Sequence, residues 1–309
     1  MMEALGKTKV VIEDGKVVEV GEPMVKYCPL FAKHRGIKEI TPEIVKENLE
    51  FRIRDFGMCS AGRHLRMRDF LSYGVSELMG MAIGKKMLDC AVIVCDGAGT
   101  VVVDDPEVVQ GIGGRVSGIM ETAPIPEVIE AIGIKNVLDP LGARIDQVMG
   151  AYKAEAMGYR RIGVSVALAK DAEAIRHELG SGAVIFAVHT TLLSEEDART
   201  MFDHCDIVSA CASRNVRAEA QKRGVMKVGN KIPMQDGEGH RLTGVVKSVS
   251  TNSVTMDFNH PLAGNNLFFK GEIQDIRQAT DEELSHGHAH YEGSCEGCDH
   301  CGGEGGHCH

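Results

Sequence analysis

The amino-acid sequence predicts an α/β fold: a parallel sheet with helices on both faces, followed by a small antiparallel β-module and a disordered His/Cys-rich tail. From about residue 125, short apolar runs alternate with stretches of helical length, which is typical of parallel β-α-β units. Residues 89–95 form a continuous apolar run, as expected of a strand buried on both faces. The residues after 285 are mostly histidine, cysteine, glycine and acids, a composition too polar to form a core.

The first elements are predicted by turn and capping signals. Residues 9–20 predict a β-hairpin with Asp14 and Gly15 as its two-residue turn. Thr41 followed by Pro42 predicts the start of a helix, because threonine caps the first turn and proline is accepted at the first helical position.

The next stretch should contain a second helix and a turn. A buried helix is expected at 70–83, where the sequence is apolar and rich in methionine and glycine. Residues 101–103 should begin another extended segment after the run 89–95. Residues 110–115 are glycine-rich, but no lysine or helix-opening serine or threonine completes a phosphate-binding loop. We therefore expect a turn or hinge there.

The alternating pattern then assigns the remaining elements. Helices are expected at 126–132, 144–157, 171–179, 194–202 and 215–222. Strands are expected at 137–138, 162–166, 183–188, 207–210 and 226–228. Residues 266–277 alternate apolar and polar side chains and predict one long strand near the end of the chain.

Composition and charge narrow the class of protein. The chain has 309 residues, 43% of them hydrophobic, with no membrane-spanning run and no apolar signal region at residues 1–11. Its ten cysteines lie partly in apolar strands and partly in the tail, which favours a reducing cytoplasm over a disulfide framework. Most of the net charge of −10 falls after residue 235. This acidity favours cations, so we expect neither nucleic acid nor a membrane as a partner.

The tail is the strongest candidate for a metal site. Thiolates and imidazoles are the ligands that nickel, copper and zinc prefer, and no lysine or arginine follows Arg277. A solvated low-complexity tail or a purification tag is the alternative, but the cysteines and acids argue against a tag. We expect nickel or zinc ions to bind here. The potential ligands are His286, His288, His290, Cys295, Cys298, His300, Cys301, His307, Cys308 and His309.

The C-terminal part resembles a known family. The block 237–290 is similar to the C-terminal part of SlyD-type FKBP-like prolyl isomerases. The matching residues are Asn259, His260, Leu262, Ala263, Gly264, Ala279, Thr280, Glu282, Glu283, Leu284, His286, Gly287 and His288. The resemblance places Leu262 and Phe269 on the wall of a proline-binding pocket, and the alternative is that both are ordinary core residues of a small β-module. The N-terminal half of the isomerase domain has no counterpart here, and half a pocket cannot exclude water.

A second resemblance covers residues 7–233. The runs 26–31, 55–59, 94–100 and 187–191 are similar to the methanogenesis marker family numbered eight, of methane-producing archaea. That resemblance implies an association with methanogenesis and brings no reaction with it. We therefore divide the chain into an α/β domain at 1–233, a partial SlyD-like β-module at 234–285 and a metal-binding tail at 286–309.

Ligand sites of open parallel sheets gather beyond the carboxyl ends of the strands. That rule selects Cys95 with Asp96, then His189, then Cys211, each following a different predicted strand. Together they could hold a metal or metallocofactor, or supply a reactive thiolate. The alternative is that both cysteines are small buried apolar residues, as free cysteine often is.

These observations support two hypotheses of different class. The first is a cytoplasmic metal-handling accessory protein for nickel or zinc, associated with methanogenesis and acting on a partner or client protein. The second is a peptidyl-prolyl cis-trans isomerase or folding chaperone of the SlyD type. A fusion whose parts act separately is a third possibility.

Overall fold

A computed structural model describes residues 1–28, 31–32, 35–68, 74–210, 212–225, 228–235, 241–249, 254–259, 272, 276–281 and 284. The chain forms two compact units, Met1–Phe258 and Asn259–His309. In the second unit the described residues include a helical-turn hydrogen bond from the amide of Leu284 to the carbonyl of Thr280, 3.0 Å long.

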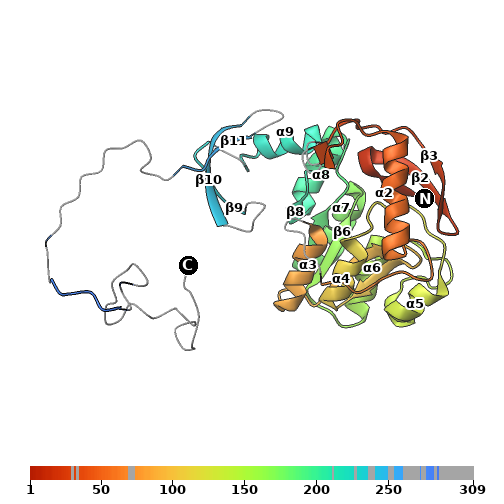
Figure 1. Cartoon of the computed structure of the whole chain (residues 1–309). Helices are drawn as coiled ribbons and strands as arrows, with labels where there is room; N and C mark the ends of the chain where they lie inside the picture. Colours follow the sequence, from red (N-terminus) through yellow and green to blue (C-terminus); the bar gives the residue numbers. More distant parts are fainter. Residues whose placement is uncertain are drawn as a thin grey trace. The chain divides into compact units, whose positions relative to one another are not determined.

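A five-stranded sheet forms the centre of the first unit, with strand order β5-β4-β6-β7-β8 (Figure 1). Strands β4, β6, β7 and β8 are parallel, and β5 is antiparallel to β4 at the edge. The strands are β4 (Cys90–Cys95), β5 (Gly99–Val103), β6 (Ile162–Val166), β7 (Ala183–Ala187) and β8 (Ile207–Val208). The predicted α/β class is confirmed, with a sheet that is mixed rather than wholly parallel.

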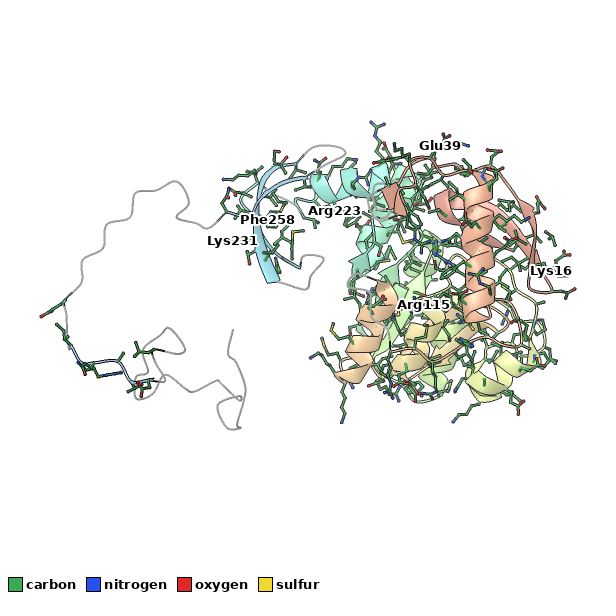
Figure 2. All side chains as sticks on the ribbon, viewed as in Figure 1. Lys16, Glu39, Arg115, Arg223, Lys231 and Phe258 are labelled. Carbon is green, nitrogen blue, oxygen red and sulfur yellow. The ribbon has the colours of Figure 1, made fainter. Side chains whose placement is uncertain are left out.

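Helices cover both faces of this sheet, and their side chains fill the space against it (Figure 2). One core lies against α3, α4 and α5, and the other against α6, α7 and α8. Helix α9 follows β8. The helices are α3 (Val75–Gly84), α4 (Pro106–Gly113), α5 (Pro126–Ile132), α6 (Gln147–Ala156), α7 (Ala169–Leu179), α8 (Glu195–His204) and α9 (Arg214–Lys222).

Strand β4 is buried on both faces because its side chains alternate between these two cores. Ala91, Ile93 and Cys95 belong to the core under α3–α5, whereas Cys90 and Val92 belong to the core under α6–α8. This alternation explains why the strand is a continuous apolar run in the sequence.

A glutamine fills the point where β4 and β6 separate. Their pairing stops at Val92 opposite Val164. The side-chain amide of Gln147 then donates to the carbonyl of Ser165 at 2.6 Å and to that of Val92 at 3.3 Å. The Thr100 hydroxyl donates to the Gln147 amide oxygen at 2.7 Å. The Gln147 side chain therefore bridges β4 and β6 beyond the end of their pairing.

The N-terminal residues form a separate three-stranded antiparallel sheet that packs with α2 (Figure 1). The hairpin turn has Asp14 at φ 49° and Gly15 at φ 69°, as the predicted two-residue turn requires. Helix α2 begins as predicted, since the Thr41 hydroxyl accepts a hydrogen bond from the amide of Ile44. The elements are β1 (Met2–Ala4), β2 (Thr8–Glu13), β3 (Lys16–Val20) and α2 (Pro42–Phe56).

A third sheet is antiparallel, with order β11-β10-β9. It consists of β9 (Lys231–Gln235), β10 (Arg241–Val249) and β11 (Val254–Asp257). An ion pair of 3.1 Å joins Lys247 to Asp257 across two of its strands. The predicted antiparallel β-module is confirmed in these residues.

Several predicted elements differ from the structure. Residues 110–115 are not a hinge, because α4 continues to Gly113 and only Gly114 caps it. Residues 137–138 form an isolated bridge from Val137 to Val101 instead of a strand. Val228 lies in a turn, with 226–227 outside the described residues. Of the long strand expected at 266–277, the described residues 272, 276 and 277 belong to no strand.

Within the described residues, no helix combines the length and the apolar character needed to cross a lipid bilayer.

Candidate functional site

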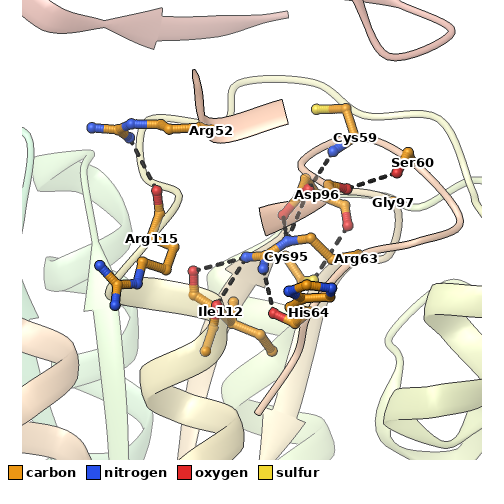
Figure 3. A network of polar contacts seen from close by, with 12 residues as sticks. Arg52, Cys59, Ser60, Arg63, His64, Cys95, Asp96, Gly97, Ile112 and Arg115 are labelled. Carbon is orange, nitrogen blue, oxygen red and sulfur yellow. Dashed lines mark hydrogen bonds and ion pairs between the residues drawn. The ribbon is translucent and has the colours of Figure 1, made fainter. Parts of the chain in front are cut away.

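A buried ion pair lies at the carboxyl end of β4. The side chain of Asp96 is 1% exposed and that of Arg63 is 0% exposed. The Arg63 Nε donates to the two carboxylate oxygens at 3.0 and 3.2 Å, and the amide of Cys59 donates to Oδ2 at 2.7 Å (Figure 3). Such charge-assisted hydrogen bonds compensate the cost of removing both ions from water.

The rest of the Arg63 guanidinium is also satisfied by hydrogen bonds. Nη1 donates to the carbonyl of His64 at 2.6 Å, and Nη2 donates to the carbonyls of Gly111 at 2.9 Å and Ile112 at 3.3 Å (Figure 3). Both of the latter carbonyls lie in the last turn of α4, where the helix dipole is negative and favours a cation. The arginine therefore joins β4 to α4.

A tight loop after α2 delivers Arg63 and Cys59 to this position. Gly57 ends the helix at φ 64°, and a Cβ there would lie 2.2 Å from the carbonyl oxygen of Gly62. The amide of His64 donates to the carbonyl of Phe56 at 3.0 Å, which closes the loop onto the helix end. Glycine is required at position 57 because the chain passes itself so closely.

The turn that carries Asp96 also forms hydrogen bonds with the segment 122–125. The amide of Gly97 donates to the Thr122 hydroxyl at 2.8 Å, and the amide of Ile125 donates to the carbonyl of Gly97 at 2.8 Å. The loop after α2 therefore binds the Asp96 carboxylate, and the segment 122–125 binds the backbone of the next residue, Gly97.

The cysteine thiols near this network are neutral at physiological pH. Burial raises the pKa of the Cys59 thiol to about 12, with the Asp96 charge acting in the same direction. Burial also raises the pKa of Cys95 well above its ordinary value, and its Sγ donates to the carbonyl of Asp96 at 3.3 Å. Burial likewise raises the pKa of the Cys90 and Cys205 thiols to about 12. Because the thiolate is the nucleophile and the metal ligand, none of these groups is activated.

His189 follows β7 with a left-handed backbone at φ 54°. Burial lowers its pKa, against the opposing charge of Glu3. Its Cε1 lies beside Gly118, where a Cβ would approach it to 3.2 Å, and Gly118 accepts a hydrogen bond of 2.7 Å from the amide of Glu3. The segment 118–125 thus reaches from His189 to the turn of Asp96.

The structure places three of the four residues of the predicted cleft. Cys95 is buried in the core under α3–α5, Asp96 is paired with Arg63, and His189 is half-buried beside Gly118. Cys211 lies outside the described residues, so the shared site stays a prediction. Leu262, Phe269 and all ten tail ligands also lie outside them. In the part of the chain that is described, no group of three or more histidine, cysteine or acidic side chains could hold a metal ion.

The sequence did not identify Arg63 or the amide of Cys59 as partners of Asp96. The chain separates Asp96 from Arg63 by 33 residues and from Cys59 by 37. An arginine in a Gly/Ser loop ordinarily indicates a solvated surface. The only local signal was the pair of glycines at 57 and 62, which predicts a close approach of the chain.

A family model described as "Uncharacterized protein conserved in archaea (DUF2099)" matches residues 1–238. "Uncharacterized protein MJ0054" of Methanocaldococcus jannaschii is 44% identical over 237 residues, which are 76% of this chain and 84% of that protein. No solved structure matches the chain significantly.

A shorter similarity is to the FKBP-type peptidyl-prolyl cis-trans isomerase SlyD. The protein of Aeromonas hydrophila is 50% identical over 72 residues, which are 23% of this chain and 33% of that protein. That of Escherichia coli K12 is 51% identical over 45 residues, which are 15% of this chain and 23% of that protein. The chain therefore spans a third or less of these SlyD proteins.

The ion pair generates a stability prediction. Asp96→Asn removes the negative charge and leaves the Arg63 guanidinium buried without a counter-charge, so we expect a loss of about 3–5 kcal/mol in the free energy of unfolding. The matched control is Asp55→Asn, since Asp55 pairs with Arg54 at the surface. That pair should contribute less than about 1 kcal/mol. Urea unfolding followed by circular dichroism measures both changes, and equal losses would contradict a central role of Asp96.

Proposed function

The chain belongs to the DUF2099 family of proteins conserved in archaea, and from this premise we propose that it is a cytoplasmic metal-handling accessory protein with nickel or zinc as its cargo. The observation that carries the proposal is the density of soft ligands at the C-terminus. Ten histidines and cysteines lie between His286 and His309.

The order of these ligands suits capture and release of a borderline transition metal. Cys295, Cys298 and Cys301 follow one another at intervals of three, with histidines interspersed and glycines between them. Four thiolate or imidazole ligands complete a tetrahedral zinc site, so the tail holds more than one set. Glycine-rich chain can close around an ion and open again because it carries little structure of its own.

The first unit, Met1–Phe258, is called the body below, and its cysteines favour different roles for the body and the tail. Its thiols at Cys59, Cys90, Cys95 and Cys205 are buried or partly buried and have raised pKa values, so they are protonated at neutral pH and compete poorly for a metal. In the proposal, the thiols of the tail are not subject to this effect of burial on the pKa. Ions should therefore gather on the tail, and the body should serve another purpose.

That purpose, in this proposal, is recognition of a protein partner or client. The association with methanogenesis rests on the resemblance to the methanogenesis marker family, so the client would be an enzyme of that process. A joint site of Cys95, Asp96, His189 and Cys211 for a metallocofactor is the less favoured use of the body. The carboxylate is engaged by Arg63 and the Cys95 thiol is neutral.

Deleting residues 286–309 tests the proposal. We expect high-capacity binding of nickel or zinc to disappear, because all ten ligands of the tail are removed, while the thermal unfolding of the body stays unchanged. Equilibrium dialysis with elemental analysis measures the metal, and differential scanning calorimetry provides the control. If the shortened chain still bound several equivalents of metal, the main site would lie in the body and the proposal would fail.

A second candidate function is prolyl isomerisation, which the similarity to SlyD favours. Isomerases must provide a dry pocket that stabilises the twisted amide, whose rotation barrier is ~18–20 kcal/mol. The matched region covers only 33% of the Aeromonas hydrophila protein, and Leu262 and Phe269 would form half of such a pocket.

The incomplete pocket predicts an inactive isomerase. We expect no acceleration of cis-trans exchange in a proline peptide by the full chain, measured in a protease-coupled assay with a complete FKBP-type isomerase as the positive control. Robust turnover that is lost in Phe269→Ala would instead establish the isomerase.

A further inference from the structure

The outer face of α3 is apolar although it is exposed to solvent. The helix has one charged residue, Glu77, and that side chain is buried. Met79 and Ile83 pack in the core under α3–α5, whereas Leu78 and Met81 are exposed on the outer side of the helix. A surface helix ordinarily carries polar side chains on its outer face. A helix that is apolar on both sides is typical of an element that packs between two partners.

Unpaired cations follow this apolar face at the end of the helix. Lys85 ends α3, and the exposed residues Lys86 and Met87 come next. Arg160 and Arg161 lie beside them, because Nη1 of Arg161 donates to the carbonyl of Lys86 at 2.6 Å. Among the described residues, no carboxylate lies within 4.0 Å of the charged groups of Lys85, Lys86 or Arg160. This local positive charge contrasts with the net charge of −10 of the chain.

The carboxylates near these cations are already engaged. Asp89 accepts hydrogen bonds from the amide of Arg160 at 3.0 Å and from Nε of Arg161 at 3.1 Å. Asp104 accepts a hydrogen bond of 2.8 Å from the hydroxyl of Tyr159. Asp89 therefore neutralises one of the two arginines and fixes the backbone of the other.

The backbone holds Lys86 and Met87 in position at a conformational cost. Lys86 is left-handed, with φ 58°, a conformation that favours glycine because it has no Cβ. The amide of Met87 donates to the carbonyl of Ala82 in α3 at 2.7 Å. The Met87 side chain is nevertheless 63% exposed. An apolar residue on a fixed backbone loses little further backbone freedom when a partner covers it.

We propose that this α3 surface binds an acidic amphipathic helix of a partner protein. Apolar side chains of the partner would cover the exposed leucine and methionines, which adapt to different shapes, while its carboxylates pair with the cations. The cations lie at one end of the apolar stripe, an arrangement that matches an elongated helix better than a flat lipid surface. The α3 surface consists of Leu78, Met81, Lys85, Lys86, Met87 and Arg160.

This inference deepens the proposed function and rests on it for the identity of the partner as the client protein. The binding chemistry itself depends on the body alone. Metal binding by the tail and helix binding by the α3 surface are therefore measured separately. A failure of the tail deletion test leaves helix binding to the α3 surface unaffected, and the reverse also holds.

Fluorescence anisotropy with a labelled synthetic helix tests the α3 surface in the full chain. The helix has leucine at every third or fourth position and glutamate between, and a chelator keeps metal on the tail from binding its carboxylates. We expect saturable binding that weakens as the salt concentration rises, because the charged contacts are exposed. The same helix with lysine in place of glutamate should bind far more weakly.

Two variants locate the binding. Lys86→Gly relieves the left-handed backbone and should not destabilise the fold, while loss of the charge weakens helix binding about twofold to fivefold. Met87→Gln removes an apolar contact and should weaken binding about tenfold. Ile134→Gln is the matched control, because Ile134 is also 63% exposed but lies in the short helix η2 (Ile134–Asn136). It should leave binding unchanged.

Four outcomes would each overturn the proposal. They are no binding of the glutamate helix, equal binding of the lysine helix, unchanged binding in both Lys86→Gly and Met87→Gln, and equal losses in Met87→Gln and Ile134→Gln. Cosedimentation with vesicles of phosphatidylserine and phosphatidylcholine provides the remaining comparison. Vesicle binding that Met87→Gln abolishes, without binding of the glutamate helix, would assign the surface to a lipid instead.

Discussion

The ion pair between Arg63 and Asp96 joins parts of the α/β body that are distant in the chain. Asp96 ends the central strand β4, and Arg63 lies in the loop after α2 and reaches the last carbonyls of α4. Each charge is buried, so each depends on the other and on the surrounding amides and carbonyls for its stability. The loop, the strand and the helix therefore have to assume their positions together.

The same burial determines what the cysteines beside the pair can do. A desolvated thiol next to a carboxylate resists ionisation, which is why the pKa of Cys59 is raised to about 12 and that of Cys95 is raised well above its ordinary value. The positive charge of Arg63 opposes this effect only in part. The burial that shields Asp96 from water therefore also keeps the thiols of Cys59 and Cys95 protonated and unreactive. In the proposal, metal ions bind to a separate segment of the chain, residues 286–309.

The sequence predicted the elements whose signals are local. The turn at Asp14 and the cap at Thr41 were confirmed, and the helix expected at 126–132 was found with the same bounds. The edge strand β5 was expected without its direction. The connection from Cys95 to Gly99 is too short for the crossover that parallel strands require, so an antiparallel pair could have been inferred. Glycines in 110–115 suggested a hinge, but packing of Val109 and Ile112 in the core outweighs their weak helix propensity.

The candidate site was predictable only in part. The rule of carboxyl strand ends selected Asp96, whereas the partners that surround its carboxylate are set by tertiary contacts. The sequence analysis did not single out Arg63, because nothing within a few residues of it marks the side chain as buried. The Gln147 side chain between β4 and β6 was missed for the same reason, since its acceptors lie 18 and 55 residues away.

The claim that ions bind to the tail while the body keeps its thiols inert can be tested residue by residue. Alkylation of the native chain at pH 7 with and without zinc, followed by peptide mass spectrometry, reports the reactivity of each cysteine. Zinc should protect Cys295, Cys298, Cys301 and Cys308, because a coordinated thiolate reacts slowly. Cys59, Cys90, Cys95 and Cys205 should stay unmodified in both samples. Rapid alkylation of Cys59 or Cys95 that zinc suppresses, with no protection in the tail, would contradict the account.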